Sequence, residues 1–310
     1  MNTPARNRQR GAALLTAMII VTLVATLASA MVWQQWRAVQ VETAERSRMQ
    51  SVWMMSGAVG FSRLILRQDD PTVDHLDDIW AKELAETKVS AFLSTDKENT
   101  DDAPEAFLRG QISDAQARYN LRNLVGTDGV IIPAELETLK RLCAVASVSA
   151  DVADRLAEGL RTALAALNGA GGSAPLMPQS VAQLEWLGVD PQTIQQLAPY
   201  IVLLPTQATL NLNTAAPEVI SAALEGLDLG SAQRFVAARP YMSIAKAQAE
   251  LGSRVTLSEA RMSVASKYFE VEGRLRLADR VLQERWLVRR ENREVIPVHR
   301  ERINLNDPGS

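Results

Sequence analysis

The sequence predicts an α+β protein with a long N-terminal helix, an antiparallel sheet and a large α-helical domain inserted between parts of that sheet. Three observations lead to this class. Residues 12–70 contain no proline, residues 106–126 and 267–299 alternate apolar and polar positions, and an alanine-rich stretch lies between them. With 310 residues, 47% of them hydrophobic and 22% charged, the chain can bury real cores and has room for about two domains.

The N-terminal segment is long and apolar enough to cross a membrane. Arg6, Arg8 and Arg10 precede Gly11, and no further charge occurs before Arg37. About 25 uncharged residues can span a hydrocarbon core of about 30 Å as a helix. Basic residues on the short side predict a single-pass protein with its N-terminus in the cytoplasm and its bulk outside.

A second interpretation is a secretory signal removed after the small residues Ala28–Ala30, which would leave an exported soluble protein. The helical pattern, however, continues past that point. Two sets of residues recur at helical spacing: Val52, Met55 and Val59, and Trp53, Gly57, Gly60 and Leu64. A continuous helix of about 55 residues would be about 80 Å long. A discarded signal has no reason to be the first half of such a helix, so retention is favoured.

The next segment reads as a stop, a loop and a strand. Asp69, Asp70 and Pro71 end the helix, because proline disfavours helix at its own position and before it. Residues 71–104 are acidic and polar, and residues 94–105 in particular predict an exposed loop. Residues 106–126 predict a short strand followed by a structured loop.

The middle of the chain is helical and its end is extended. Residues 133–167 favour helix, residues 168–175 form a flexible break, and two short helices are expected at Gln179–Leu187 and Pro191–Leu197. Residues 267–299 predict two or three antiparallel strands. Their turns are expected around Ala278–Asp279 and Glu291–Asn292.

The N-terminal leader resembles the class III signal of type IV pilins and pseudopilins. A short basic stretch ends in Gly11, and an uninterrupted apolar helix follows. The resemblance implies that a prepilin peptidase cuts between Gly11 and Ala12 and methylates the new amine of Ala12. Thr16 then becomes the fifth mature residue, where most relatives have a glutamate that can pair with the terminal amine of a neighbouring subunit. A non-acidic residue there is similar to the K-type minor subunit of type II secretion, which is thought to sit at the filament tip.

A second match lies in the centre of the chain. Six residues correspond to a stretch of K-type pseudopilins that forms a strand, an acidic turn and an "N-L" pair: Gly110, Asp114, Ala117, Tyr119, Asn120 and Leu121. The chain is therefore identified as resembling the K-type minor pseudopilins (general secretion pathway protein K). The resemblance implies a pilin-like fold and a non-catalytic role in protein export, initiating and capping the periplasmic pseudopilus tip. It also implies the bacterial inner membrane as the location and, as partners, prepilin peptidase and the I- and J-type minor pseudopilins.

The resulting domain prediction has five segments. Residues 1–11 are the prepilin leader, residues 12–36 the transmembrane and assembly helix, and residues 37–125 the rest of the helix with the first part of the pilin-like domain. Residues 126–255 are the inserted α-helical domain. Residues 256–310 are the strands that complete the pilin-like domain.

The inserted domain contains a helix-hairpin-helix or SAM-like part at residues 210–251. We expect Thr214 to cap a helix that has Pro217 in its first turn, and Gly226 and Gly230 to bracket the turn into a second helix. Related modules bind DNA phosphates through a Gly-x-Gly hairpin, but here Asp228 occupies a glycine position and would repel a phosphate. The net charge of −3 also argues against nucleic acid. Packing is the preferred role, and a membrane-anchored DNA-capture protein is the alternative function.

Acidic residues supply the candidates for a metal site. Two clusters could offer oxygen atoms to calcium, which is associated with some K-type pseudopilins. They are Asp69, Asp70, Asp74, Asp77 and Asp78, and Asp96, Glu98, Asp101, Asp102 and Glu105. Neither has EF-hand spacing, so a solvated acidic surface is preferred and no ligand is assigned.

No catalytic constellation emerges from the sequence. The chain has two histidines, His75 and His299, and one cysteine, Cys143, which makes a zinc site or a Cys/His pair difficult to assemble. No serine lies in a nucleophile elbow. The sequence therefore predicts an assembly protein and not an enzyme.

Overall fold

The computed structural model describes residues 8–89, 105–167, 174–277 and 280–303. The chain divides into two units, Met1–Met54 and Met55–Ser310. Helix α1, Arg8–Gln68, begins in the first unit and ends in the second.

The described part of the first unit is the first part of α1, which contains its long apolar stretch. Every described side chain from Ala12 to Thr43 is exposed, including Leu14 at 65% and Ile20 at 62%. Among the described residues, α1 is the one helix long and apolar enough to cross a membrane, with a mean hydropathy of 2.3 over its most apolar window. Such a surface needs lipid or other helices to cover it. The apolar helix therefore fits the predicted transmembrane anchor.

The second unit contains one antiparallel five-stranded sheet in the order β1-β2-β7-β8-β9. The strands are β1 (Leu84–Lys88), β2 (Ala106–Asp114), β7 (Tyr268–Leu277), β8 (Arg280–Glu291) and β9 (Glu294–Ile303). The prediction of an antiparallel sheet behind a long helix is confirmed. Strand β1 was not predicted, because its sequence LAETK is short and polar and has no apolar alternation.

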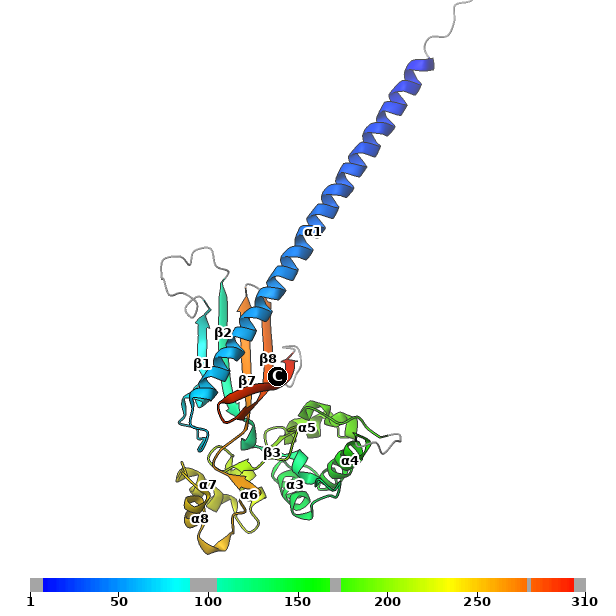
Figure 1. Cartoon of the computed structure of the whole chain (residues 1–310). Helices are drawn as coiled ribbons and strands as arrows, with labels where there is room; N and C mark the ends of the chain where they lie inside the picture. The colour runs from blue at the N-terminus through cyan, green and yellow to red at the C-terminus, as the bar shows by residue number, and fades with distance from the viewer. Residues whose placement is uncertain (1–7, 90–104, 168–173, 278–279, 304–310) are drawn as a thin grey trace, which may run out of the picture. The chain divides into compact units, whose positions relative to one another are not determined.

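The sheet packs one face against the last part of α1, as Figure 1 shows. In β7 the buried positions alternate with polar ones, which places Phe269 and Val271 in the core beneath Leu66 of the helix. Trp80 lies in the same core, with its ring edge-on to Phe269 at a centroid distance of 5.2 Å. Burying each such side chain contributes about 1.5–3 kcal/mol. Just beyond the helix, the Asp70 carboxylate accepts from Thr72 N at 2.9 Å in the predicted stop.

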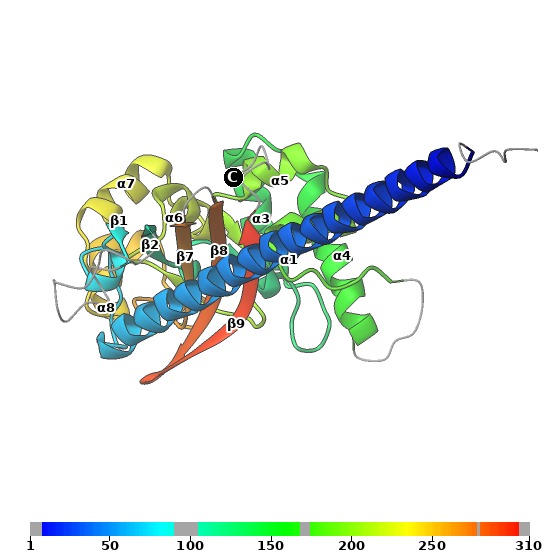
Figure 2. The ribbon, with the colours of Figure 1, turned by 90° about the horizontal axis from the view of Figure 1, so that it is seen from above.

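Between β2 and β7 the chain leaves the sheet and builds a helical block. Its α-helices are α3 (Pro133–Val145), α4 (Asp151–Leu167), α5 (Pro191–Leu197), α6 (Pro217–Ala223), α7 (Leu229–Ala237) and α8 (Ile244–Leu251). Figures 1 and 2 show α3–α5 and α6–α8 as two neighbouring groups, and their buried side chains form one continuous core. The predicted insertion of helices between strands is thus observed, while the exact limits of the five predicted segments stay predictions.

Short elements complete the second unit. The 3-10 helices are η1 (Ile79–Ala81), η2 (Ala115–Ala117), η3 (Leu121–Leu124), η4 (Val181–Leu187) and η5 (Gly252–Arg254). Two pairs of two-residue parallel strands connect parts of the block: β3 (Tyr119–Asn120) with β4 (Ile201–Val202), and β5 (Leu210–Asn211) with β6 (Met262–Ser263). The helical stretch predicted over 133–167 is broken between α3 and α4, where Ser147 has a φ of 58°.

The expected cap of α6 was wrong. The N-cap position is Ala216, which makes no side-chain capping bond, and Pro217 begins the helix. Thr214 instead donates its hydroxyl to the Asp114 carboxylate at 2.6 Å. The Thr214 side chain therefore points to the buried Asp114 carboxylate and not to the start of the helix.

Candidate functional site

The predicted processing residues lie at the start of α1. Gly11 is helical, and the side chains from Ala12 to Thr43 are exposed. Thr16 Oγ1 donates to the carbonyl oxygens of Ala12 and Ala13, both at 3.0 Å. Thr16 therefore satisfies its own hydroxyl inside the helix and brings no charge into the apolar segment.

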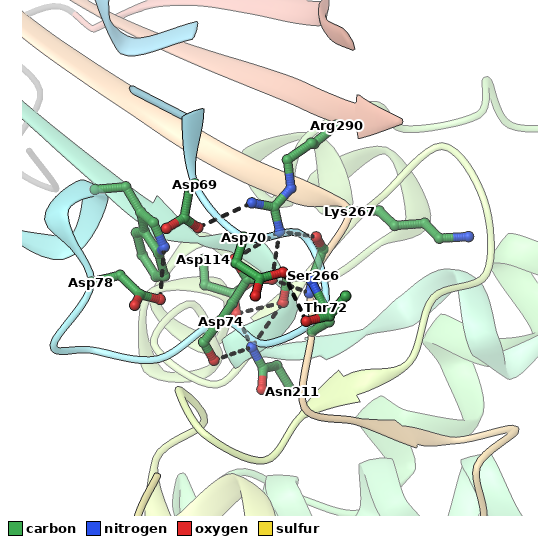
Figure 3. Close-up of polar contacts among 12 residues, drawn as sticks. Asp69, Asp70, Thr72, Asp74, Asp78, Asp114, Asn211, Ser266, Lys267 and Arg290 are labelled. Atoms are coloured by element: carbon green, nitrogen blue, oxygen red, sulfur yellow. Dashed lines mark hydrogen bonds and ion pairs between the residues drawn. The ribbon is translucent and has the colours of Figure 1, made fainter. Parts of the chain in front are cut away.

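A buried polar cluster joins the sheet to the helical block in the second unit, as Figure 3 shows. Its members come from segments far apart in the sequence, and we call them the junction cluster: Asp69, Asp74, Asp114, Asn211, Ser266 and Arg290. Three of the six are carboxylates and one is a guanidinium. If every member were ionised, the cluster would hold a net negative charge in a buried place, so its protonation is coupled to the fold.

Asp114 is the centre of the cluster on the side of the helical block. It is buried, and its Oδ1 accepts from Gln116 N at 2.7 Å. Its Oδ2 accepts from Asn211 Nδ2 at 2.9 Å and from the hydroxyls of Thr214 and Ser266, both at 2.6 Å. Burial nevertheless raises the pKa of Asp114 above its usual range, against the lowering effect of these donors. The strand position identified in the sequence match thus binds the first and last segments of the block together.

Arg290 is the positive centre of the cluster. Its Nη2 lies 2.7 Å from Asp74 Oδ1 and 2.6 Å from Asp74 Oδ2, and its Nη1 lies 3.2 Å from Asp69 Oδ2. The side chains of Arg290 and Asp74 are 1% and 0% exposed. Burial raises the pKa of Asp74 to about 7, and Arg290 opposes that rise. Arg290 also stacks over Phe269 at 4.8 Å, which ties the ion pair to the sheet core.

The acidic residues proposed as calcium donors are only partly brought together. Carboxylate oxygens of Asp69, Asp74 and Asp78 lie within 4.8 Å of one another. Asp70 turns to Thr72, and Asp77 is exposed. The second candidate cluster lies outside the described residues except for Glu105, which is exposed and lies 3.3 Å from Lys88 Nζ.

This donor set does not fit calcium. The Arg290 guanidinium already occupies the space between Asp69 and Asp74, and Ser266 N donates to Asp74 at 2.7 Å. Asp78 Oδ2 accepts from the backbone of His75 and from Trp80 Nε1. Calcium requires six to eight oxygen ligands with free lone pairs, which these carboxylates have committed elsewhere.

The junction cluster makes stability depend on pH. Because the pKa of Asp74 is raised in the folded state, the folded chain keeps a proton that the unfolded chain releases near pH 4. That contribution is lost as the pH rises through about 7, so we expect the free energy of unfolding to fall between pH 5.5 and pH 8. Chemical denaturation at both pH values measures it. Asp74→Asn should flatten this dependence, whereas the exposed control Asp77→Asn should keep it; an unchanged slope in Asp74→Asn would contradict the assignment.

The helix-hairpin-helix turn carries its own carboxylate. Gly226 has a φ of 81°, and Asp228 accepts from Ser231 N at 2.9 Å at the start of α7. The same arrangement occurs earlier, where Gly188 has a φ of 79° and Asp190 accepts from Thr193 N at 2.9 Å before α5. This first copy was missed in the sequence, although "LGVDPQT" and "EGLDLGS" share its pattern. In both turns a carboxylate occupies the helix N-terminus where a DNA phosphate would bind.

The single cysteine and the two histidines are not gathered into one site. Cys143 is buried, and burial raises the pKa of its thiol to about 11, which keeps it protonated. His75 Nδ1 lies 3.3 Å from Asp78 Oδ1, and His299 lies on β9. Arg290, Asn211 and Ser266 were not identified from the sequence. For Asn211, the sequence offers one weak signal: a polar residue between two leucines in "LNLNT".

Comparisons with known proteins agree with this fold. Family models described as "Type II secretion system (T2SS), protein K" match residues 117–206 and 210–265. Type II secretion system protein K of Pseudomonas aeruginosa is 26% identical over 308 residues, which cover 89% of this chain and 87% of that protein. The protein of the same name from Pectobacterium carotovorum is 25% identical and covers 96% of this chain and 97% of its own length.

A solved structure shares the fold. It is the crystal structure of the GspK-GspI-GspJ complex from the type 2 secretion system of enterotoxigenic Escherichia coli. One of its chains matches with a TM-score of 0.64 at 17% identity, over 84% of this chain and 98% of that chain. The likeness in the arrangement of helix, sheet and additional helices is therefore established at the level of fold.

Proposed function

This chain belongs to the type II secretion system protein K family of minor pseudopilins, and from that premise we propose that it initiates and caps the periplasmic pseudopilus. In this role it acts by assembly and not by catalysis. Its partners would be the I- and J-type minor pseudopilins, in keeping with the GspI and GspJ chains that accompany the structural neighbour.

The observation that carries the proposal is the end of the sheet at which the helical block is inserted. The block begins after Asp114 at the end of β2 and finishes before Tyr268 at the start of β7. Within the junction cluster, Arg290 of β8 binds Asp69, which lies just after the end of α1. A subunit stacked beyond this end would meet the block, whereas the apolar part of α1 stays available for helix packing. A subunit that accepts neighbours on one side only is suited to a tip.

The N-terminal segment supports the same proposal. Under this proposal, prepilin peptidase cuts between Gly11 and Ala12 and methylates Ala12. The protein is then retained in the inner membrane with its bulk in the periplasm. Thr16, the fifth mature residue, is neutral and bonded to its own helix. A subunit at the tip has no neighbour above it whose terminal amine needs a carboxylate, which is consistent with the missing charge at this position.

We expect mass spectrometry of the protein purified from its membrane to show a methylated N-terminus at Ala12. The same preparation should co-purify with I- and J-type minor pseudopilins. An N-terminus at Met31 or an intact Met1 would contradict the proposal. Duplex DNA should not bind with a steep salt dependence; if it did, the DNA-capture function would replace this one.

A further inference from the structure

Three arginines gather on one face of the sheet, and one of them has no carboxylate partner among the described residues. Arg109 on β2 lies directly opposite Arg274 on β7, and Arg276 follows on the same face of β7. A Cβ on Gly273, the residue before Arg274, would lie 2.7 Å from Met55 Sδ of α1. Because successive side chains of a strand point to opposite faces, Arg274 and Arg276 lie on the face away from the helix. Like charges directly opposite each other in a ladder are destabilising. The arrangement therefore costs stability unless an anion is present.

Two of these arginines have carboxylate partners within the chain. Arg109 Nε lies 2.6 Å from Glu83 Oε1, and Arg276 Nε lies 3.1 Å from Glu86 Oε1. In the described part of the chain, no carboxylate pairs with Arg274. The next acid on the face, Glu272, is engaged by Gln283 at 2.5 Å and by Arg285 at 3.5 Å. The local balance is three positive charges against two negative ones, and the unbalanced charge is that of Arg274.

A cavity lies over this unbalanced charge. It is open to solvent, has a volume of about 400 Å³, and is lined by Glu83, Ala85, Glu86, Arg109, Arg274 and Arg276. On the same face, the Arg276 guanidinium lies over the ring of Phe107, 4.2 Å from its centroid. The cavity is large enough for one carboxylate side chain, and a guanidinium is the group best shaped to hold a carboxylate.

We propose that this arginine pocket binds an aspartate or glutamate side chain of a neighbouring minor pseudopilin, with Arg274 as its ion-pair partner. The proposal rests on the proposed function, because it assigns a surface to the assembly of the tip. One carboxylate brings the charge of the pocket to zero. The pocket is too exposed to hold a free carboxylate firmly, since exposed ion pairs are weak, and a docked protein surface would supply both the acid and the exclusion of water.

The test compares two charge reversals in the full chain, co-produced with I- and J-type minor pseudopilins of the same organism. Arg274→Glu changes the pocket, and Arg293→Glu makes the same change in the exposed turn between β8 and β9. We expect Arg274→Glu to weaken association at least tenfold and Arg293→Glu to change it less than twofold. The unfolding temperature of Arg274→Glu should equal or exceed that of the unaltered chain, because a glutamate opposite Arg109 forms a favourable cross-strand pair.

Lost association with undiminished stability identifies a contact surface. Replacing the contacting aspartate or glutamate of the partner with lysine should then restore binding to Arg274→Glu. That rescue would identify the carboxylate that occupies the pocket. Equal association of the two reversals, or a lowered unfolding temperature in Arg274→Glu, would overturn the proposal. The proposal would also be overturned if free glutamate raised the unfolding temperature of the unaltered chain while Arg274→Glu bound the partner pseudopilins as well as the unaltered chain does. Failure of the unaltered chain to bind either partner would instead count against the proposed function.

Discussion

Replacing Arg290 with methionine is expected to lower the free energy of unfolding by about 3–5 kcal/mol at pH 8. Methionine keeps much of the apolar volume but removes the guanidinium that lies 2.6–2.7 Å from both oxygens of Asp74. Asp74 would then be a buried carboxylate without its counter-charge. At pH 5.5 the loss should be smaller, because Asp74 has a pKa of about 7 and can remain protonated. Urea unfolding at both pH values measures the difference.

Two further variants control this prediction. Arg289→Met alters the neighbouring residue, whose side chain is 37% exposed, and should cost less than about 1 kcal/mol. The double change Arg290→Met with Asp74→Asn should cost less than the sum of its single changes, because no carboxylate is left unpaired. If Arg290→Met behaved like Arg289→Met, the junction cluster would have no role in holding the block to the sheet.

Replacing Gly11 with valine is expected to abolish both processing and secretion. If the peptidase cuts after Gly11, a branched side chain at the residue before the cut will obstruct the scissile bond. The uncut chain would keep its basic leader, including Arg8 and Arg10, in the cytoplasm and could not leave the bilayer to enter a filament. The length of the N-terminal peptide and the amount of exported cargo should therefore change together. Both are measured in cells without their own copy of this protein.

The control for Gly11→Val adds the same kind of apolar volume elsewhere in the helix. Ala17→Val lies beyond the cut on an exposed, apolar part of α1, so processing should be normal. Normal cleavage of Gly11→Val would show that the cut lies elsewhere. Secretion that continued with an uncut Gly11→Val chain would show that processing is not needed for its role.

Local pattern was sufficient to predict much of this protein. The helix α1 follows from a long run without proline, and its end follows from Asp70 and Pro71. Strands β7–β9 follow from alternation, because the side-chain period of a strand is two and one face must be buried. Strand β1 was not predicted, since LAETK has no such alternation; it pairs with β2 at the edge of the sheet.

The junction cluster could not have been predicted from local pattern. Asn211 bonds to Asp114 across 97 residues, and Arg290 bonds to Asp74 across 216. Each of these residues is polar and looks like part of a solvated loop or an exposed strand in the sequence. Their burial depends on how the block closes on the sheet, and the same closure took Thr214 away from the cap expected of it.

The membrane helix, the strands and the family resemblance are properties of neighbouring residues, whose spacing sets the secondary structure and the leader motif. The ion pair of Arg290 and the facing arginines Arg109 and Arg274 arise from strand register and domain packing instead. A shift of one residue in the β2–β7 register would turn Arg109 to the other face. Contacts of this kind join residues that are far apart in the sequence, so only the tertiary structure decides them. The buried ion pair and the arginine pocket both depend on such contacts.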